Sequence, residues 1–283
     1  LKPYLLQIRP ITTKSNWNRS ITKRIDATLY GVQLFLRERL KRIDGVFGAT
    51  TVLGQMPDWN PAEMIGRAPR ALAASLYRTI ITDNAWRIAR DRMGYAIPVG
   101  QPLMLMLAGQ PFIDTRLSFH SFLPKSISPS VAEKLTDHWV SQLSASPELH
   151  DKIEFDIAIT AYSFDIEDKI ERLVGVALTD GEKREFKEAH LQHTRDLIKG
   201  NGNGSISSAM DMIDSLAHKQ RDAGSSSIAT LAIMLDECVS LGTIPFSMLA
   251  RHGFIAKTIL LSLKSLGVLD EDDVNNIQAS IYT

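Results

Sequence analysis

The sequence has little cysteine. It holds one, Cys238, among 283 residues, so no disulfide can form within the chain. Proteins of a reducing compartment use cysteine in this way, and we therefore expect a cytoplasmic protein. The neighbours of Cys238 are apolar, which predicts a buried, small apolar side chain rather than a reactive nucleophile.

Excess charge and long apolar runs are also lacking. Lys and Arg number 32, as do Asp and Glu, so the net charge is zero. A neutral chain has no general attraction to nucleic acid or to an anionic membrane, and we expect neither as a partner. The uncharged stretch 102–112 is much shorter than the roughly 20 residues of a membrane-spanning helix. The chain shows no signal peptide and does not open on methionine, which we expect of a piece of a longer protein.

What is present is an ordinary globular composition. Apolar residues make up 44% of the chain and charged residues 23%. The length suits one large domain or two modest ones, with enough apolar surface to bury a core.

Apolar residues recur mainly at helical spacing. This spacing predicts a long helix over 18–43, a helix over 71–93 with a short break at 82–84, a helix over 130–144, and helices from about 166 to the end. Residues 4–9 suit a buried strand that Pro10 ends, because proline lacks the donor that a sheet needs. The segment GNGNG at 200–204 follows no strand and precedes no Lys-Ser/Thr pair, so it predicts a turn rather than a phosphate-binding loop.

Two segments alternate with a period of two residues. Residues 103–122 predict a hairpin of two extended arms around Ala108-Gly109-Gln110-Pro111, and residues 152–160 predict a third strand. The expected fold class is therefore mainly α (α+β), a helical domain with a small antiparallel β-hairpin or sheet.

One loop gathers side chains that could bind a ligand. Asp58, Trp59, Asn60 and Glu63 lie between prolines, and Asn60-Pro61 is a good helix start. The loop could contact a substrate or a moving domain. Alternatively, its residues only cap a helix and anchor it through the tryptophan.

The second arm of the hairpin gathers further polar groups. On a strand, Asp114, Arg116, Ser118 and His120 would share one face and could meet a small anion. We expect an acceptor pocket between this face and the Asp58–Glu63 loop, with Trp59 and Phe112 as apolar walls and Arg116 at its edge. The alternative is that Asp114 and Arg116 pair with each other or with Asp58 and fasten the loop to the sheet.

Other ionisable groups favour structural roles. His150, Asp151, Lys152 and Glu154 suit a surface turn better than acid–base chemistry, and Arg251, His252 and Lys257 suit a solvated or interdomain face. His190 and His193 are spaced like two metal ligands on a helix, but no third ligand follows at a recognisable spacing. We therefore expect no metal site and no catalytic residue in this chain.

Five segments carry a family resemblance: LLQIRPIT (5–12), MPDWNPAEMIG (56–66), SLYRTIITDNAW (75–86), LAGQPFIDTRLSF (107–119) and PELHDKIEF (147–155). They resemble segments of the phosphoenolpyruvate synthase and pyruvate, phosphate dikinase family, of which rifampin phosphotransferase is a relative. The last ATP-grasp strand of that family reads L-Q-x-R-P, and its Gln and Arg face ATP. The resemblance implies this role for Gln7 and Arg9. A guanidinium suits phosphate oxygens.

The resemblance also implies a domain order. Residues 1–13 would be the C-terminal strand of an ATP-grasp nucleotide-binding domain, residues 14–165 a helical middle domain with a small sheet, and residues 166–283 a helical continuation of that domain. The family's phosphohistidine loop, phosphoenolpyruvate barrel, Gly-rich lid and metal-binding carboxylates have no counterpart here.

The resemblance therefore implies a middle, interdomain or acceptor-binding fragment of an ATP-dependent kinase-type phosphotransferase that is not catalytic alone. ATP and Mg²⁺ would be cofactors of the parent protein, and this fragment would hold neither. Its partners would be the other domains of the parent and a small-molecule acceptor. The alternatives are a small-molecule binding module and a helical spacer that positions a swivelling phosphohistidine domain.

Overall fold

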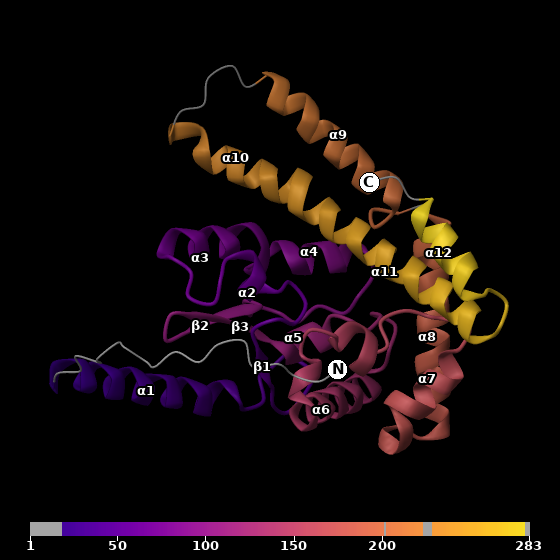
Figure 1. The fold of residues 1–283 in the computed structure, drawn as a ribbon, viewed down its shortest axis with the longest axis horizontal. Coiled ribbons are helices and arrows are strands. Elements are labelled where there is room, and N and C mark those ends of the chain that lie inside the picture. The colour runs from indigo at the N-terminus through magenta and orange to yellow at the C-terminus, as the bar shows by residue number, and fades with distance from the viewer. Residues whose placement is uncertain (1–18, 201, 223–227, 281–283) are drawn as a thin grey trace, which may run out of the picture. The chain divides into compact units, whose positions relative to one another are not determined.

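The computed structural model describes residues 19–200, 202–222 and 228–280. The chain divides into two units, Leu1–Glu38 and Arg39–Thr283. The described residues are mainly helical with one small antiparallel sheet, which confirms the expected fold class (Figure 1). The expected strand at residues 4–9 lies outside the described residues, and so does the boundary at residue 13.

The elements follow one another in two runs. The first run contains the sheet: α1 Arg19–Arg39, β1 Leu53–Gly54, α2 Pro61–Met64, α3 Ala71–Tyr77, the π-helix η1 Arg78–Thr82, α4 Ala85–Arg92, β2 Met104–Leu107, β3 Gln110–Asp114, α5 Thr115–His120 and α6 Pro129–Ala145. The second run is helical throughout: η2 Pro147–Leu149, η3 Ile153–Ile157, α7 Ile166–Leu173, η4 Gly175–Ala177, α8 Asp180–Lys199, α9 Ile206–Asp222, η5 Ile228–Thr230, α10 Leu231–Glu237, η6 Cys238–Thr243, α11 Ile244–Ser265 and α12 Glu271–Ala279.

The predicted hairpin is present. Strands β2 and β3 pair antiparallel, with Met104 opposite Ile113 and Leu107 opposite Gln110. The two turn residues, Ala108 and Gly109, have φ values of 50° and 81°. Positive φ at both positions gives a turn whose twist matches that of the paired strands. The hairpin therefore forms in the predicted segment, but its turn is shorter than predicted, because Gln110 and Pro111 belong to β3.

The prediction that the second arm continues as a strand to residue 122 was wrong. Strand β3 ends at Asp114 and α5 begins at Thr115, so Asp114, Arg116, Ser118 and His120 do not share a strand face. Every residue of α5 is buried. A short helix that is buried all round has no polar stripe, and its mixture of polar and apolar residues can imitate the period of a strand.

The third strand was also predicted in the wrong place. Residues 153–157 form the π-helix η3, in which Ile153 and Ile157 are buried four residues apart. The third strand is β1, which pairs antiparallel with β3 and places Leu53 opposite Asp114. The sheet order is β1-β3-β2.

The helices agree better with the sequence. Helix α6, Pro129–Ala145, matches the predicted helix over 130–144. Helices α3 and α4 with η1 cover 71–92 and break at the predicted place, and α1 ends four residues before the predicted end at 43. In Figure 1, α3 and α4 lie on one side of the sheet and α5 and α6 on the other, and α11 packs on α4.

Aromatic side chains fill the core between α5, α6 and α8. Trp139 of α6 is fully buried and its ring centre lies 5.7 Å from that of Phe119 and 6.4 Å from that of Phe186. A second cluster joins α4, α9 and α11 through Ala85, Met248 and other buried apolar residues. The C-terminal helices are thus packed onto the same unit as the sheet.

The run α10–η6–α11, Leu231–Ser265, is long and apolar enough to cross a membrane by length and composition alone. This run was not predicted from the sequence. Core helices of soluble proteins pass the same test, so we treat it as weak evidence. Cys238 lies in η6 and is half-buried rather than buried as expected.

The turn before α9 brings two backbone segments into close contact. A Cβ atom on Gly204 would lie 2.6 Å from the Arg92 carbonyl oxygen and 2.8 Å from Met93 Cα. A Cβ on Gly202 would meet nothing within 4 Å. The glycine at 204 is therefore required by the packing of this turn against the end of α4.

We predict that Gly204→Ala lowers the free energy of unfolding by about 1–3 kcal/mol, because the new methyl group overlaps backbone atoms that cannot move aside. Gly202→Ala is the matched control and should change stability by less than about 0.5 kcal/mol, as most surface substitutions do. Urea unfolding of the two variants and the wild type measures the difference. Equal stability of both variants would contradict the close packing.

Candidate functional site

The structure assigns different surroundings to the residues that the sequence singled out. Gln7 and Arg9 lie outside the described residues. Asp58, Trp59 and Asn60 are half-buried, Glu63 is exposed, and Asp114 and Arg116 are fully buried.

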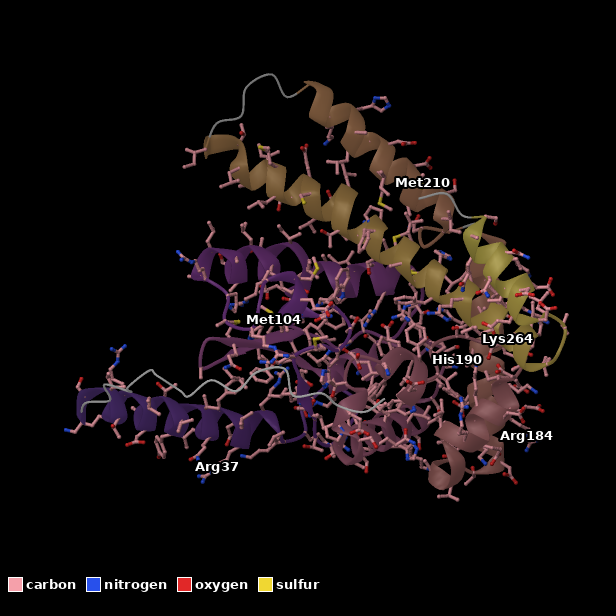
Figure 2. The ribbon with its side chains drawn as sticks, viewed as in Figure 1. Arg37, Met104, Arg184, His190, Met210 and Lys264 are labelled. Atoms are coloured by element: carbon pink, nitrogen blue, oxygen red, sulfur yellow. The ribbon has the colours of Figure 1, made fainter. Side chains whose placement is uncertain are left out.

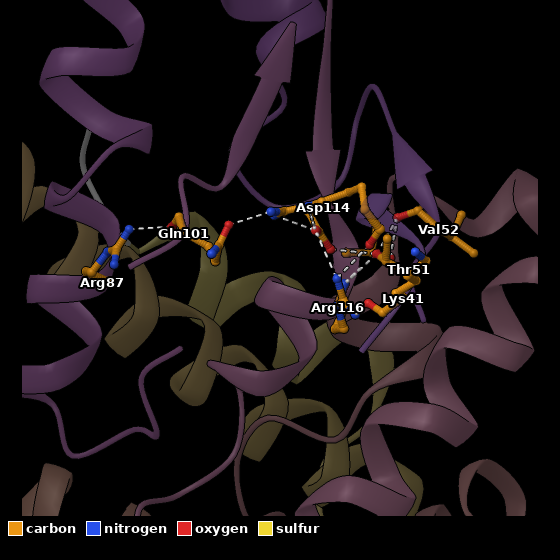
Figure 3. Close-up of polar contacts among 9 residues, drawn as sticks. Lys41, Thr51, Val52, Arg87, Gln101, Asp114 and Arg116 are labelled. Atoms are coloured by element: carbon orange, nitrogen blue, oxygen red, sulfur yellow. Dashed lines mark hydrogen bonds and ion pairs between the residues drawn. The ribbon is translucent and has the colours of Figure 1, made fainter. Parts of the chain in front are cut away.

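Asp114 and Arg116 belong to a buried polar network (Figure 3). Arg116 donates from Nη1 to the Lys41 carbonyl at 2.9 Å and from Nη2 to the Arg39 carbonyl at 3.1 Å. Asp114 accepts at Oδ2 from Arg39 Nε at 2.7 Å and at Oδ1 from the Thr51 hydroxyl at 2.6 Å. The network thus ties the segment that precedes β1 to the end of β3.

This network leaves no room for a ligand at Arg116. Its side chain has no exposed surface, and its guanidinium is 3.8 Å from the Asp114 carboxylate. Burial lowers the pKa of Arg116, and Asp114 opposes that shift. Arg116 does not line the pocket described below, so the expected pocket with Arg116 at its edge is not found there.

The Asp58–Glu63 loop is held by its own backbone and by buried partners. Asp58 and Asn60 have φ values of 57° and 44°, in the left-handed region that residues other than glycine rarely adopt. The Asn60 side chain accepts from the Glu63 amide at 3.2 Å, which confirms the predicted helix start. Tyr77 donates its hydroxyl to the Trp59 carbonyl at 2.5 Å, and the Ser118 hydroxyl donates to Asp58 at 2.9 Å.

Asp58 is part of a buried charge cluster, which we define as Asp58, Arg90, Glu154 and Arg251. Arg90 Nη2 lies 2.6 Å from Asp58 Oδ1 and 3.9 Å from Glu154 Oε1, and Arg251 Nη2 donates to Glu154 Oε1 at 2.9 Å. The side-chain exposures are 5% for Asp58, 5% for Arg90, 10% for Glu154 and 4% for Arg251. Two buried cations therefore balance two buried anions.

Burial raises the pKa of the Glu154 carboxyl above its ordinary value. Burial is the main cause, since it disfavours the charged form, and Asp58 acts in the same direction while Arg251 and Arg90 oppose it. Buried carboxyls with a raised pKa gather at functional sites, although structural ion pairs also perturb pKa values.

Aromatic rings surround the two arginines. The centre of the Phe122 ring lies 4.8 Å from Arg90 Cζ and 5.0 Å from Arg251 Cζ. Arg251 Cζ is also 5.5 Å from the Phe254 ring and 5.7 Å from the Tyr95 ring. The ring faces attract the guanidinium groups and partly replace the water that burial removes.

A pocket of about 180 Å³ opens beside the charge cluster. All four cluster residues line it, and Trp59, Phe246 and Phe254 supply apolar walls. Trp59 and Phe246 have ring centres 6.3 Å apart. The site thus joins a few polar groups to aromatic walls, as small-molecule sites usually do.

Two side chains at this pocket carry buried nitrogens, Trp59 Nε1 and Arg251 Nη1, that make no hydrogen bond with the described residues. Both nitrogens are closed off from solvent, as are Trp86 Nε1 and Trp139 Nε1 in the core. They therefore do not face the open pocket and do not mark a ligand contact.

A larger concavity of about 350 Å³ lies along the glycine turn at 200–204. His193 lines it and its Nε2 lies 2.8 Å from the Met93 carbonyl, while Lys125 forms an ion pair with Asp91. His190, which Figure 2 labels, lies in α8. It is fully buried, and its ring nitrogens lie 3.1 Å and 3.2 Å from the backbone carbonyl oxygens of Phe186 and Ile159. Among the described residues no group of three His, Cys, Asp or Glu side chains is placed to hold a metal ion.

Three members of the charge cluster were missed at the level of sequence. Arg90 was not considered, and Glu154 and Arg251 were predicted in a surface turn and on a solvated or interdomain face. The surface turn was wrong for Glu154 and the solvated face was wrong for Arg251, because the two side chains pair in the interior. One signal was available, since Arg251 lies in the apolar run Leu231–Ser265. Its partner is 97 residues away, which local patterns do not reveal.

Comparison with known proteins leaves the chain without an assigned family. No family model, no curated protein and no solved structure matches it.

We predict that Asp58→Asn lowers the free energy of unfolding by about 3 kcal/mol, because it leaves the buried Arg90 without its nearest anion. Asparagine tolerates the left-handed backbone at this position, so the change tests the charge rather than the turn. Asp83→Asn is the matched control. It removes the anion of a far more exposed ion pair, Arg78–Asp83, and should cost about 0–1 kcal/mol. Equal losses in urea unfolding would show that the cluster contributes no more than a surface pair.

His120 gives a second prediction. Its Nδ1 accepts from the Phe47 amide at 3.0 Å, and burial lowers its pKa from the ordinary value to about 4. Between pH 6.5 and about 4 the unfolded chain binds this proton and the folded chain does not, so stability falls as the pH falls. The slope from one such group approaches about 1.4 kcal/mol per pH unit.

His120→Gln should reduce this slope, and His218→Gln on the exposed face of α9 should leave it unchanged. The free energy of urea unfolding at several pH values between 7 and 4 measures both slopes. If His120→Gln keeps the wild-type slope, His120 is not held neutral by the fold.

Proposed function

We propose that this chain is the acceptor-binding middle part of a phosphoenolpyruvate synthase-like, ATP-dependent phosphotransferase. The observation that carries the proposal is the pocket beside the charge cluster. Two of its lining residues, Asp58 and Trp59, belong to the segment 56–66 that resembles this family. The pocket is thus built partly from the segment on which the resemblance rests.

In this proposal ATP binding and phosphoryl transfer take place in other domains of the parent protein. Gln7 and Arg9 would face ATP within a complete ATP-grasp domain, and ATP with Mg²⁺ would be bound there. The part described here would hold the small-molecule acceptor. The proposed location is the cytoplasm, and neither nucleic acid nor a membrane is a proposed partner.

A spacer is the second candidate. The buried network around Asp114 and Arg116 favours it, because closed polar contacts of this kind fix the geometry of a rigid body. A spacer would position a swivelling phosphohistidine domain and would leave the pocket empty. The two candidates differ in one measurable property, which is the binding of a small molecule.

We predict that the complete protein incorporates label from ATP into an acid-labile phosphohistidine, and that this chain alone neither incorporates label nor binds Mg-ATP with micromolar affinity. Two side chains, without a lid and metal ligands, cannot hold a magnesium nucleotide tightly. Incubation with labelled ATP and calorimetric titration are the two measurements. Micromolar binding by the chain alone, or an unlabelled complete protein, would refute the proposal.

Arg9→Ala in the complete protein tests the ATP contact. A lost guanidinium–phosphate contact should slow labelling by at least about tenfold, the change that corresponds to 1.36 kcal/mol in the barrier. The matched control is Arg37→Ala, which removes an exposed arginine of α1. Equal labelling rates for the two variants would mean that Arg9 does not contact ATP.

A further inference from the structure

The pocket beside the charge cluster offers a hydrogen-bond acceptor. Glu154 lines the pocket and accepts from Arg251 at Oε1, and its Oε2 accepts no hydrogen bond from the described residues. The nitrogens Trp59 Nε1 and Arg251 Nη1 are closed off from solvent and therefore from the open pocket. A polar group that donates would therefore suit this pocket better than one that only accepts.

The charge balance argues for a neutral ligand. Arg90 and Arg251 already balance Asp58 and Glu154, and all four side chains line the pocket. An anion would add to two nearby carboxylates, and a cation would add to two nearby guanidiniums. Either would leave an unbalanced charge beside four charged side chains that are at most 10% exposed, which is costly.

The size and walls of the pocket limit the body of the ligand. The volume is about 180 Å³, well below that of a drug-sized site. A cavity of about 150 Å³ holds a benzene molecule in other proteins, so one ring with a small substituent fits here. Trp59, Phe246 and Phe254 provide aromatic surfaces against which a flat ring can pack.

We propose that this pocket binds a neutral, ring-sized molecule whose hydroxyl or primary amide donates to the Glu154 carboxylate. The inference rests on the proposed function, because it names the class of small molecule that the acceptor-binding part takes. A hydroxyl and a primary amide would make the same kind of hydrogen bond in this pocket, and only a binding experiment distinguishes the two.

Matched single-ring probes test the proposal on the chain as it stands. Phenol and benzamide carry the two polar groups, anisole lacks the donor, benzoate is an anion and benzylamine a cation. Probes of about eight non-hydrogen atoms bind with dissociation constants on the order of millimolar. Ligand-observed NMR titration should show phenol or benzamide binding at least about tenfold more tightly than the other three, the effect of one buried hydrogen bond.

Two pairs of variants assign the binding to this pocket. Ala250→Leu fills the pocket and should weaken binding at least about tenfold, and Ala256→Leu on the exposed side of α11 should not. Phe246→Ala removes a half-exposed wall without emptying the core, and Phe164→Ala removes an equally exposed ring elsewhere. The Phe246 variant keeps the test decisive if Ala250→Leu does not fold.

Several outcomes would overturn the inference. Benzoate as the tightest probe would indicate an anion site, and benzylamine as the tightest probe would indicate an aromatic cage with carboxylates. Equal binding of all five, binding that the pocket variants do not change, or no binding at all would show that the pocket selects no such ligand. None of these outcomes affects the labelling of the complete protein by ATP. Failure of the pocket inference can therefore be distinguished from failure of the proposed function.

Discussion

The pairing of two buried arginines with two buried carboxylates is the interaction on which the rest of this structure depends. Asp58 comes from a loop, Arg90 from α4, Glu154 from η3 and Arg251 from α11, so four segments meet at one neutral cluster. Burying such charges costs free energy that only close geometry offsets. The C-terminal helices are consequently held to the sheet unit by a contact that tolerates little displacement.

The same cluster determines the shape of the pocket. Asp58 is held by Arg90 and Ser118 in a left-handed backbone conformation, and this places Trp59 next to Phe246. Strained conformations persist where the surroundings fix them, and they are common at functional sites. The loop is thus rigid before any ligand arrives, which lowers the entropy that binding would cost.

Elements with a strong local signal were predictable. The hairpin turn at Ala108-Gly109, the Asn60 cap and α6 each depend on residues close in sequence, and each is present. Residues 115–120 and 153–157 were predicted as strands and are helical. Residues 115–120 are buried on every side, so their alternation of polar and apolar residues does not indicate which side faces water. In 153–157 only Ile153 and Ile157 are buried, and Phe155, which a strand would have placed on the same face, is 38% exposed.

The sequence by itself determined the class of fold, because helical periodicity, a turn that needs positive φ and proline at a helix start all act over a few residues. It also pointed to Asp58 and Trp59 in a punctuated loop. Only the tertiary structure decided which charges are buried. Arg90 lies 32 residues from Asp58, and Arg251 lies 97 residues from Glu154. Whether such side chains face water or one another depends on how the segments pack, and no local pattern encodes that choice.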